Sequence, residues 1–246
     1  MDENNAIKVL REVKSILDER GVRYWLDQGT LLGAVRAKKF IPWDDDIDIG
    51  TMYNEVEKIK QQISPFRKKG FEISSLSNFA IEIKKDSIVV DIYLFRIESD
   101  KAWRYEYGSK SKIFSVLRRI GFLSYYKESV KIESFKRKMI YLFIPKFIGK
   151  FIIKIWGFYG CKYMPWVVPK HYYEHLDKIT FYDMEFNIPS LVKEYLSYKY
   201  GNSWLKPNSN YNYLIDDGAI EYSFKDKKKD KVSSFSDFFV TWRGIK

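Results

Sequence analysis

Residues 29–50 read GTLLGAVRAKKFIPWDDDIDIG, a glycine turn and an acidic run joined by basic and apolar residues. Asp46 and Asp48 alternate with isoleucines at the end of this stretch. Because side chains alternate across a β-strand, a strand over residues 45–49 places both carboxylates on one face and the isoleucines on the other. Two carboxylates on one half-buried face repel each other, which raises their pKa values or requires a cation.

A third carboxylate follows in the segment IVVDIYLF, residues 88–95, which is apolar apart from Asp91 and Tyr93. Burying a lone carboxylate in a strand is costly unless it is paired or binds a metal. Carboxylate oxygens are the preferred ligands of hard divalent cations such as Mg²⁺ or Mn²⁺. We therefore expect a metal site formed by Asp46, Asp48 and Asp91.

Two other interpretations of these acids stay open. The run Asp44–Asp48 is also typical of a solvated acidic turn, or of N-caps for a helix that begins near Tyr53. Asp91 also suits a structural ion pair, for which Arg96 and Arg104 are the candidate partners.

The glycine turn lies between a predicted strand over residues 22–26 and a predicted short helix over 31–38, for which Thr30 is the expected N-cap. Backbone amides at a helix start, with a glycine that allows close approach, form a cradle for phosphate. We therefore expect Gly29 and Thr30 to bind phosphate. An ordinary strand–turn–helix corner explains the same residues.

Apolar spacing also predicts the remaining elements. A helix is expected over residues 4–20, a second over 54–63, and strands over 71–76, 80–84 and 88–95. Further along, the sequence predicts a strand pair over 180–188 and a helix over 191–200 that Gly201 ends. Asp216, Asp217 and the basic run after them are expected in a solvated loop.

Residues 101–170 interleave lysines and arginines with aromatic and aliphatic residues, and we expect them to form a helical insert. Within this segment, Lys146, Lys150 and Lys154 share one face of a predicted helix in residues 134–159. Such a helix suits a membrane interface, and an amphipathic core helix equally. Single-stranded nucleic acid ranks behind both, because no nucleic-acid recognition motif accompanies the pattern.

Composition indicates which kinds of partner and which cellular compartment to expect. The net charge of +11 favours anionic partners, namely nucleic acid, an anionic membrane surface or a phosphorylated substrate. The single cysteine, Cys161, excludes an internal disulfide and suits a reducing compartment. The first residues show no secretory signal. We expect a cytoplasmic protein, with peripheral contact to the inner face of the membrane through residues 101–170.

Two motifs together resemble the LicD family, which includes the fukutin-related proteins. GTLLGAVR followed by IPWDDDIDIG is similar to that family's signature. Residues 188–207, IPSLVKEYLSYKYGNSWLKP, resemble its second landmark, a Pro-led helix that ends in Tyr-Gly before Trp. Residues 101–170 match no family pattern. Ala37 stands where the family often has a histidine after the arginine of GAVR.

The resemblance implies a nucleotidyltransferase-like α/β (α+β) fold, a mixed sheet flanked by helices, in one catalytic domain over residues 1–246. Family members transfer a phospho-alcohol, such as phosphocholine or ribitol phosphate, from a CDP-linked donor to a glycan hydroxyl. For this chain it implies Mg²⁺- or Mn²⁺-dependent transfer to a cell-surface glycan or its lipid-linked precursor, as in lipopolysaccharide, capsule or teichoic acid biosynthesis.

The expected roles follow from this resemblance. The residues expected to bind the metal and to catalyse the transfer are Asp46, Asp48 and Asp91. The residues expected to bind the donor phosphates are Gly29, Thr30, Arg36 and Lys38. Asp44 and Asp45 are expected to orient the metal ligands.

Two alternative functions use the same residues differently. The three acids also suit attack at the α-phosphate of a nucleoside triphosphate, with release of pyrophosphate. A non-catalytic protein that binds an anionic surface through its basic segment is the second alternative. A binding protein of this kind has no need for a cluster of uncompensated carboxylates. We also expect no nucleic-acid partner.

Overall fold

The structure is a computed structural model that describes residues 1–76, 79–109 and 161–221. The chain divides into two compact units, Met1–Arg104 with Trp166–Glu221, and Tyr105–Pro165 with Tyr222–Lys246. The second unit is described only at residues 105–109 and 161–165, which are the ends of two strands. The candidate site lies in the first unit.

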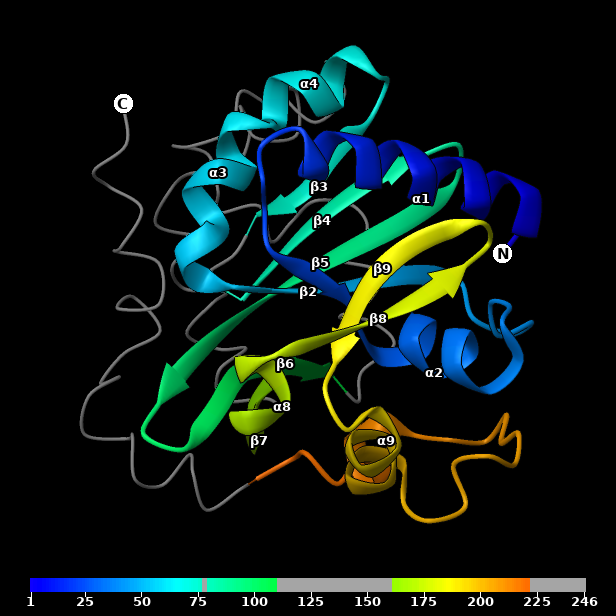
Figure 1. The fold of residues 1–246 in the computed structure, drawn as a ribbon, viewed down its shortest axis with the longest axis vertical. Coiled ribbons are helices and arrows are strands. Elements are labelled where there is room, and N and C mark those ends of the chain that lie inside the picture. Colours follow the sequence, from blue (N-terminus) through cyan, green and yellow to red (C-terminus); the bar gives the residue numbers. More distant parts are fainter. Residues whose placement is uncertain (77–78, 110–160, 222–246) are drawn as a thin grey trace. The chain divides into compact units, whose positions relative to one another are not determined.

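The first unit is built on a mixed β-sheet (Figure 1). Its central strands follow the order β1 (Tyr24–Leu26), β2 (Asp46–Met52), β5 (Ile88–Glu98), β4 (Ala80–Lys85) and β3 (Glu72–Leu76). β2 and β5 run parallel, whereas the other pairs in this order are antiparallel. β6 (Lys101–Ser109) pairs with β5 and with β7 (Cys161–Pro169), and β8 (Leu176–Phe181) and β9 (Met184–Pro189) form a separate hairpin.

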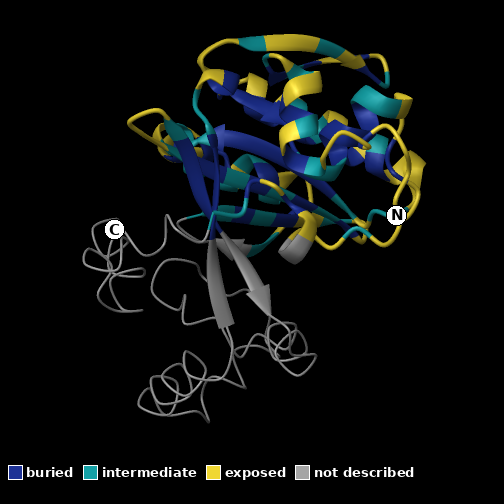
Figure 2. Ribbon diagram, turned by 90° about the horizontal axis from the view of Figure 1, so that it is seen from below, coloured by how far each residue is buried: buried dark blue, intermediate teal, exposed yellow. Residues whose placement is uncertain are grey.

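Helices flank this sheet, which confirms the predicted α/β class. They are α1 (Glu3–Asp18), α2 (Gln28–Ala37), the 3₁₀ turn η1 (Tyr53–Glu55), α3 (Val56–Gln61), α4 (Ile63–Lys68), α8 (His171–Glu174), α9 (Val192–Tyr200) and α10 (Tyr213–Asp216). α1 lies across one face of the sheet in Figure 1 and buries an apolar stripe that includes Val9, Leu10 and Val13. Figure 2 shows the sheet strands as the buried interior of this unit.

The alternation predicted for β2 is present. Ile47 and Ile49 are fully buried on one face, and Asp46 and Asp48 lie on the other. β5 alternates in the same way, with Asp91 half-buried between buried neighbours. The parallel register pairs Asp48 with Asp91, so the carboxylates of adjacent strands share one face of the sheet.

Several predicted elements differ from the structure. Both ends of the predicted helical insert are strands, β6 and β7. Residues 110–160, which include the whole lysine-bearing helix expected in 134–159, lie outside the described residues. The helix expected over 54–63 is a 3₁₀ turn and two short helices, and α4 continues through Pro65 because proline is tolerated in a first helical turn. In the described part of the chain, no helix has the length and apolar character needed to cross a bilayer.

Candidate metal centre

Three aspartates gather where β2 begins. The side chains of Asp44, Asp46 and Asp48 each offer an oxygen, and these three oxygens lie within 4.8 Å of one another. Asp48 is almost entirely buried, at 4% exposure, and Asp44 and Asp46 are half-buried. Within residues 1–76, 79–109 and 161–221, no lysine or arginine forms an ion pair with any of the three. The cluster is therefore a concentration of negative charge without a cationic side chain to neutralise it.

The residues in this cluster differ from the predicted set. Asp44 was predicted only to orient the metal ligands, but its carboxylate supplies one of the three grouped oxygens, whereas Asp45 is exposed. Asp91 is not one of the three, but it lies opposite Asp48 on β5, and its charge acts on both Asp46 and Asp48. The two strands thus bring a fourth carboxylate to the edge of the cluster.

The N-terminus of α2 is joined directly to the cluster. Asp27, not Thr30, is the N-cap of this helix, because its carboxylate accepts a hydrogen bond from the N–H of Gln28 at 2.8 Å. The N–H of Gly29 donates to Oδ2 of Asp48 at 3.0 Å, and the hydroxyl of Thr30 accepts from the backbone N–H of Asp48 at 2.9 Å. Gly29 and Thr30 therefore hold Asp48 in place from the helix side.

Close approach explains the glycine at position 29. A Cβ added there would lie 2.1 Å from Oδ2 of Asp44 and 3.4 Å from Oδ2 of Asp48. Any side chain at this position would therefore displace a carboxylate of the cluster. The glycine turn and the acidic run, which are separate motifs in the sequence, form one site.

Burial and mutual repulsion set the electrostatics of the cluster. Burial, followed by the charges of Asp44 and Asp91, raises the pKa of Asp46 to about 8. Burial, followed by the charges of Asp46 and Asp44, raises the pKa of Asp48 well above its ordinary value. Burial also raises the pKa of Asp44. Without a cation, these groups hold protons at a pH at which ordinary aspartates are ionised.

This raised pKa predicts how stability depends on pH in the metal-free protein. The Asp46 carboxyl takes up its proton with a pKa near 3.9 when unfolded and about 8 when folded. Its contribution to stability is therefore full below about pH 4 and is lost as the pH rises to about 8. We expect Mg²⁺ to raise the Tm by about 5–10 °C at about pH 9, at a roughly hundredfold excess over its Kd, and to have little effect at about pH 5.

Thermal unfolding in EDTA and in Mg²⁺ at both pH values measures this effect. The Asp46→Asn variant is the control, because it lacks the titrating group and should show a smaller loss of stability between the two pH values. An equal gain from Mg²⁺ at both pH values would contradict the prediction.

The predicted basic residues occupy different positions. Arg36 is half-buried and donates from Nη1 to the carbonyl oxygen of Trp204 at 3.3 Å, and burial lowers the pKa of its guanidinium. It follows Gly29 by seven residues, which places it about 10 Å further along the same face of α2. Lys38 is exposed just after the helix ends, in a left-handed conformation. Helix periodicity thus puts Arg36 on the side of α2 that carries Gly29, whereas Lys38 lies beyond the end of the helix.

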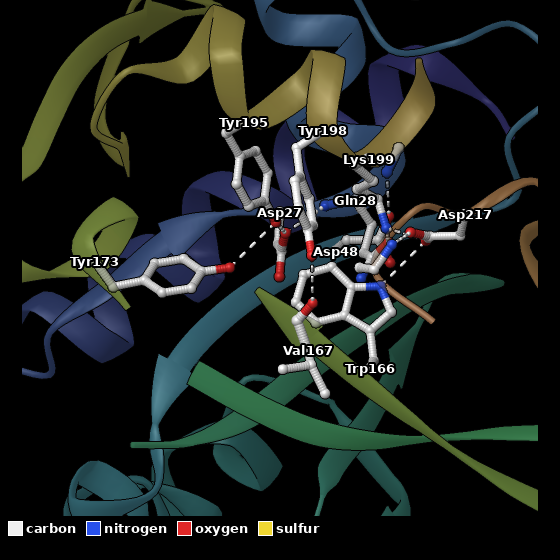
Figure 3. A network of polar contacts seen from close by, with 12 residues as sticks. Asp27, Gln28, Asp48, Trp166, Val167, Tyr173, Tyr195, Tyr198, Lys199 and Asp217 are labelled. Carbon is white, nitrogen blue, oxygen red and sulfur yellow. Dashed lines mark hydrogen bonds and ion pairs between the residues drawn. The ribbon is translucent and has the colours of Figure 1, made fainter. Parts of the chain in front are cut away.

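A buried polar network contacts the residues at the start of α2 (Figure 3). The hydroxyl of Tyr195 donates to Asp27 at 2.8 Å, and the ammonium of Lys199 contacts Oδ2 of Asp217 at 2.5 Å and the side-chain oxygen of Gln28. Burial raises the pKa of the Asp27 carboxyl, although the charges of Lys199 and Arg104 oppose this effect. Asp217 is 6% exposed, so its expected place in a solvated loop is wrong.

The residues present fit a divalent cation. All the grouped donor atoms are carboxylate oxygens, which hard cations prefer. Two raised pKa values, at Asp46 and Asp48, show the cost of ionising the cluster without positive charge. A bound Mg²⁺ or Mn²⁺ would remove that cost, and the donor set does not choose between them.

A known family matches the part of the sequence that forms this site. Residues 21–115 match the family model described as LicD/FKTN/FKRP, nucleotidyltransferase domain. The matched residues contain the glycine turn, the acidic run and Asp91, and the match confirms the resemblance predicted from residues 29–50.

Three relatives illustrate the extent of the similarity. The protein RT0683 of Rickettsia typhi is 33% identical over 94 residues, which are 38% of this chain and 29% of the relative. Ribitol 5-phosphate transferase FKRP of Homo sapiens is 44% identical over 60 residues, 23% of this chain and 12% of the relative. Lipopolysaccharide cholinephosphotransferase LicD of Haemophilus influenzae is 38% identical over 53 residues, 22% of this chain and 20% of the relative. This chain therefore spans less than a third of the length of each of these relatives.

Proposed function

We propose, from the match of residues 21–115 to the LicD/FKTN/FKRP family model, that this chain transfers a phospho-alcohol from a CDP-activated donor to a hydroxyl group of a glycan. The observation that carries the proposal is the group of three carboxylates, Asp44, Asp46 and Asp48, whose oxygens lie within 4.8 Å of one another. Among the described residues, no lysine or arginine forms an ion pair with them. The names of the relatives FKRP and LicD suggest ribitol phosphate or phosphocholine as the transferred group. The acceptor is a cell-surface glycan or its lipid-linked precursor.

The proposed site binds the donor through its diphosphate. Asp44, Asp46 and Asp48 would hold a divalent cation, which supplies charge neutralisation for the diphosphate and for the departing CMP. The N–H of Gly29 keeps the Asp48 carboxylate oriented toward the cluster. Arg36 supplies a fixed positive charge further along the same helix face, where the second phosphate of the donor can lie.

In the proposed transfer step, the oxygen of the acceptor hydroxyl forms a bond to the phosphorus that carries the alcohol. The bond from that phosphorus to the CMP oxygen breaks, and CMP leaves with the bonding electron pair. Asp91, next to Asp48 on the neighbouring strand, accepts the proton of the hydroxyl. Asp91 is half-buried, and the pairing of β5 with β2 sets its backbone position opposite Asp48.

The proposal extends to membrane contact. The basic, aromatic residues 134–159 would hold the enzyme near a lipid-linked acceptor, an idea that rests on the sequence because these residues lie outside the described ones.

Donor hydrolysis tests the reaction class directly. The full chain is incubated separately with CDP-choline, CDP-ribitol, CDP-glycerol and CTP in Mg²⁺, and CMP and pyrophosphate are separated by chromatography. We expect CMP from at least one CDP-alcohol, and its loss with EDTA and in the Asp48→Asn variant. Pyrophosphate from CTP, without CMP from any CDP-alcohol, would overturn the proposal in favour of nucleotidyl transfer. CMP release that a chelator leaves unchanged would overturn the metal dependence.

A further inference from the structure

The second landmark of the sequence supplies a lysine that is sequestered from solvent. Lys199 lies near the end of α9, and its side chain is 1% exposed. Its ammonium contacts the carboxylate of Asp217 and the side-chain oxygen of Gln28 (Figure 3). A buried ammonium is stable only where hydrogen-bonding partners surround it. The position of Lys199 is therefore closely specified.

Asp217 is the second partner of this lysine, beside Gln28. Its Oδ2 also accepts a hydrogen bond from the indole N–H of Trp166 at 3.1 Å, and its Oδ1 accepts from the N–H of Ala219 at 2.9 Å. With three donors, the carboxylate cannot rotate without losing contacts. Asp217 thus serves as a fixed anchor for the ammonium of Lys199.

Gln28, the third member, has an unusual backbone conformation. It is the first residue of α2, and its φ is +45°, in the left-handed region that residues with side chains rarely adopt. Such a conformation persists only where the surrounding structure imposes it. The contact from Lys199 to the Gln28 side chain is a restraint of this kind, and it comes from a residue 171 positions away in the chain.

The peptide that follows Gln28 is the one that contacts the candidate metal centre. The N–H of Gly29 donates to Oδ2 of Asp48 at 3.0 Å, so the orientation of the Gln28–Gly29 peptide determines where this hydrogen bond points. A continuous series of contacts therefore runs from Asp217 through Lys199, Gln28 and Gly29 to Asp48. Lys199 itself touches none of the clustered carboxylates in the described structure.

We propose that Lys199, anchored by Asp217, is a positioning residue that holds Gln28 in its left-handed conformation and thereby aims the Gly29 amide at Asp48. The inference rests on the metal site of the proposed function and assigns a role to the second landmark, which the metal chemistry alone leaves unexplained. It makes the affinity of the site for a divalent cation depend on a residue outside the cluster.

Binding of Mn²⁺ alone, without donor or acceptor, provides the readout. Titration of the full chain with Mn²⁺, followed by electron paramagnetic resonance of the free ion, measures the Kd. We expect Lys199→Met to raise this Kd about tenfold or more. Lys178→Met is the matched control, because Lys178 forms an exposed ion pair with Glu185, and we expect an unchanged Kd.

A substitution at Gln28 separates positioning from general stability. Glycine adopts a left-handed φ without steric cost, so Gln28→Gly should not need the restraint from Lys199. We expect Lys199→Met to raise the Kd no more than about twofold in the Gln28→Gly background. A lysine that only stabilises the fold would not be rescued in this way. If Lys199→Met fails to fold with Asp217 left unpaired, the charge-neutral pair Lys199→Met/Asp217→Asn takes its place in both backgrounds.

The outcomes separate this inference from the proposed function. An unchanged Kd in Lys199→Met, with a wild type that binds Mn²⁺, would overturn the inference and leave the proposed function intact. Equal losses of affinity in the Gln28 and Gln28→Gly backgrounds would likewise overturn it, because Lys199 would then act by another route. No Mn²⁺ binding by the wild type would overturn the proposed metal site and the inference together.

Discussion

Replacement of Asp48 or Asp46 by asparagine is expected to lower phospho-alcohol transfer at least about a thousandfold while the protein stays folded. Each substitution removes one negative charge and one oxygen donor from a cluster of three. With two carboxylates left, the site holds a divalent cation more weakly and neutralises the donor diphosphate less well. Turnover of a CDP-alcohol, with CMP release as the measured quantity, gives the size of the loss.

Stability should move in the opposite direction to activity. In the metal-free protein, burial and repulsion raise the pKa values of Asp46 and Asp48, so ionising them opposes folding. An asparagine has no charge to ionise, and we expect both variants to have a Tm equal to or above that of the wild type at about pH 8 in EDTA. Mg²⁺ should raise the Tm of the wild type but not of the variants.

Asp45→Asn is the matched control for these two variants. Asp45 belongs to the same acidic run, but its side chain is exposed and lies outside the group of three oxygens. We expect its turnover to stay within about twofold of the wild type. If Asp48→Asn also kept near-normal turnover with a genuine donor, the assignment of this cluster as the metal centre would be wrong.

Much of the candidate site follows from local patterns in the sequence. The alternation of Asp46 and Asp48 with isoleucines predicts one carboxylate face, because the two-residue period of a strand is a local property. The lone Asp91 in an apolar segment predicts that a second strand lies beside the first. The parallel pairing of Asp48 with Asp91 agrees with both predictions.

Contacts outside the regular strands were beyond these patterns. The two-residue period would place Asp44 on the face of Asp46 only if the strand began that early, but β2 begins at Asp46, and Asp44 joins the group from the preceding loop. Thr30 resembles a helix cap in sequence, but the cap is Asp27, and the hydroxyl of Thr30 accepts from the backbone of Asp48, 18 residues later. Such a choice between two polar residues three positions apart depends on what packs against the helix start.

The buried network is the clearest example of a signal that the sequence did not provide. Asp217 precedes a strongly basic run, which favours a solvated loop, yet it is buried against Lys199 and Trp166. The second landmark did mark the helix that carries Lys199 and Tyr195. Lys199 contacts Gln28 and Tyr195 contacts Asp27, which lie 171 and 168 positions away in the chain and could not be assigned from spacing.

Gly29→Ala should produce the second large effect, a loss of metal binding with only a small loss of stability. An alanine Cβ would lie 2.1 Å from Oδ2 of Asp44, so either this carboxylate moves or the start of α2 shifts away from Asp48. We expect the Kd for Mn²⁺ to rise at least about tenfold and transfer to fall about a hundredfold. Alanine is a better helix former than glycine, so the free energy of unfolding in EDTA should fall by no more than about 1 kcal/mol.

Gly21→Ala provides the opposite pattern as a control. A Cβ at Gly21 meets no atom within 4 Å, but its φ is +58°, so alanine there should cost stability and leave Mn²⁺ binding unchanged. A double-mutant cycle then tests the cause of the Gly29 effect. In an Asp44→Ala background the added methyl has room, and Gly29→Ala should raise the Kd further by no more than about threefold. Full additivity of the two substitutions would show that the methyl acts elsewhere, because a shared clash between Gly29 and Asp44 requires that removing the carboxylate relieves it.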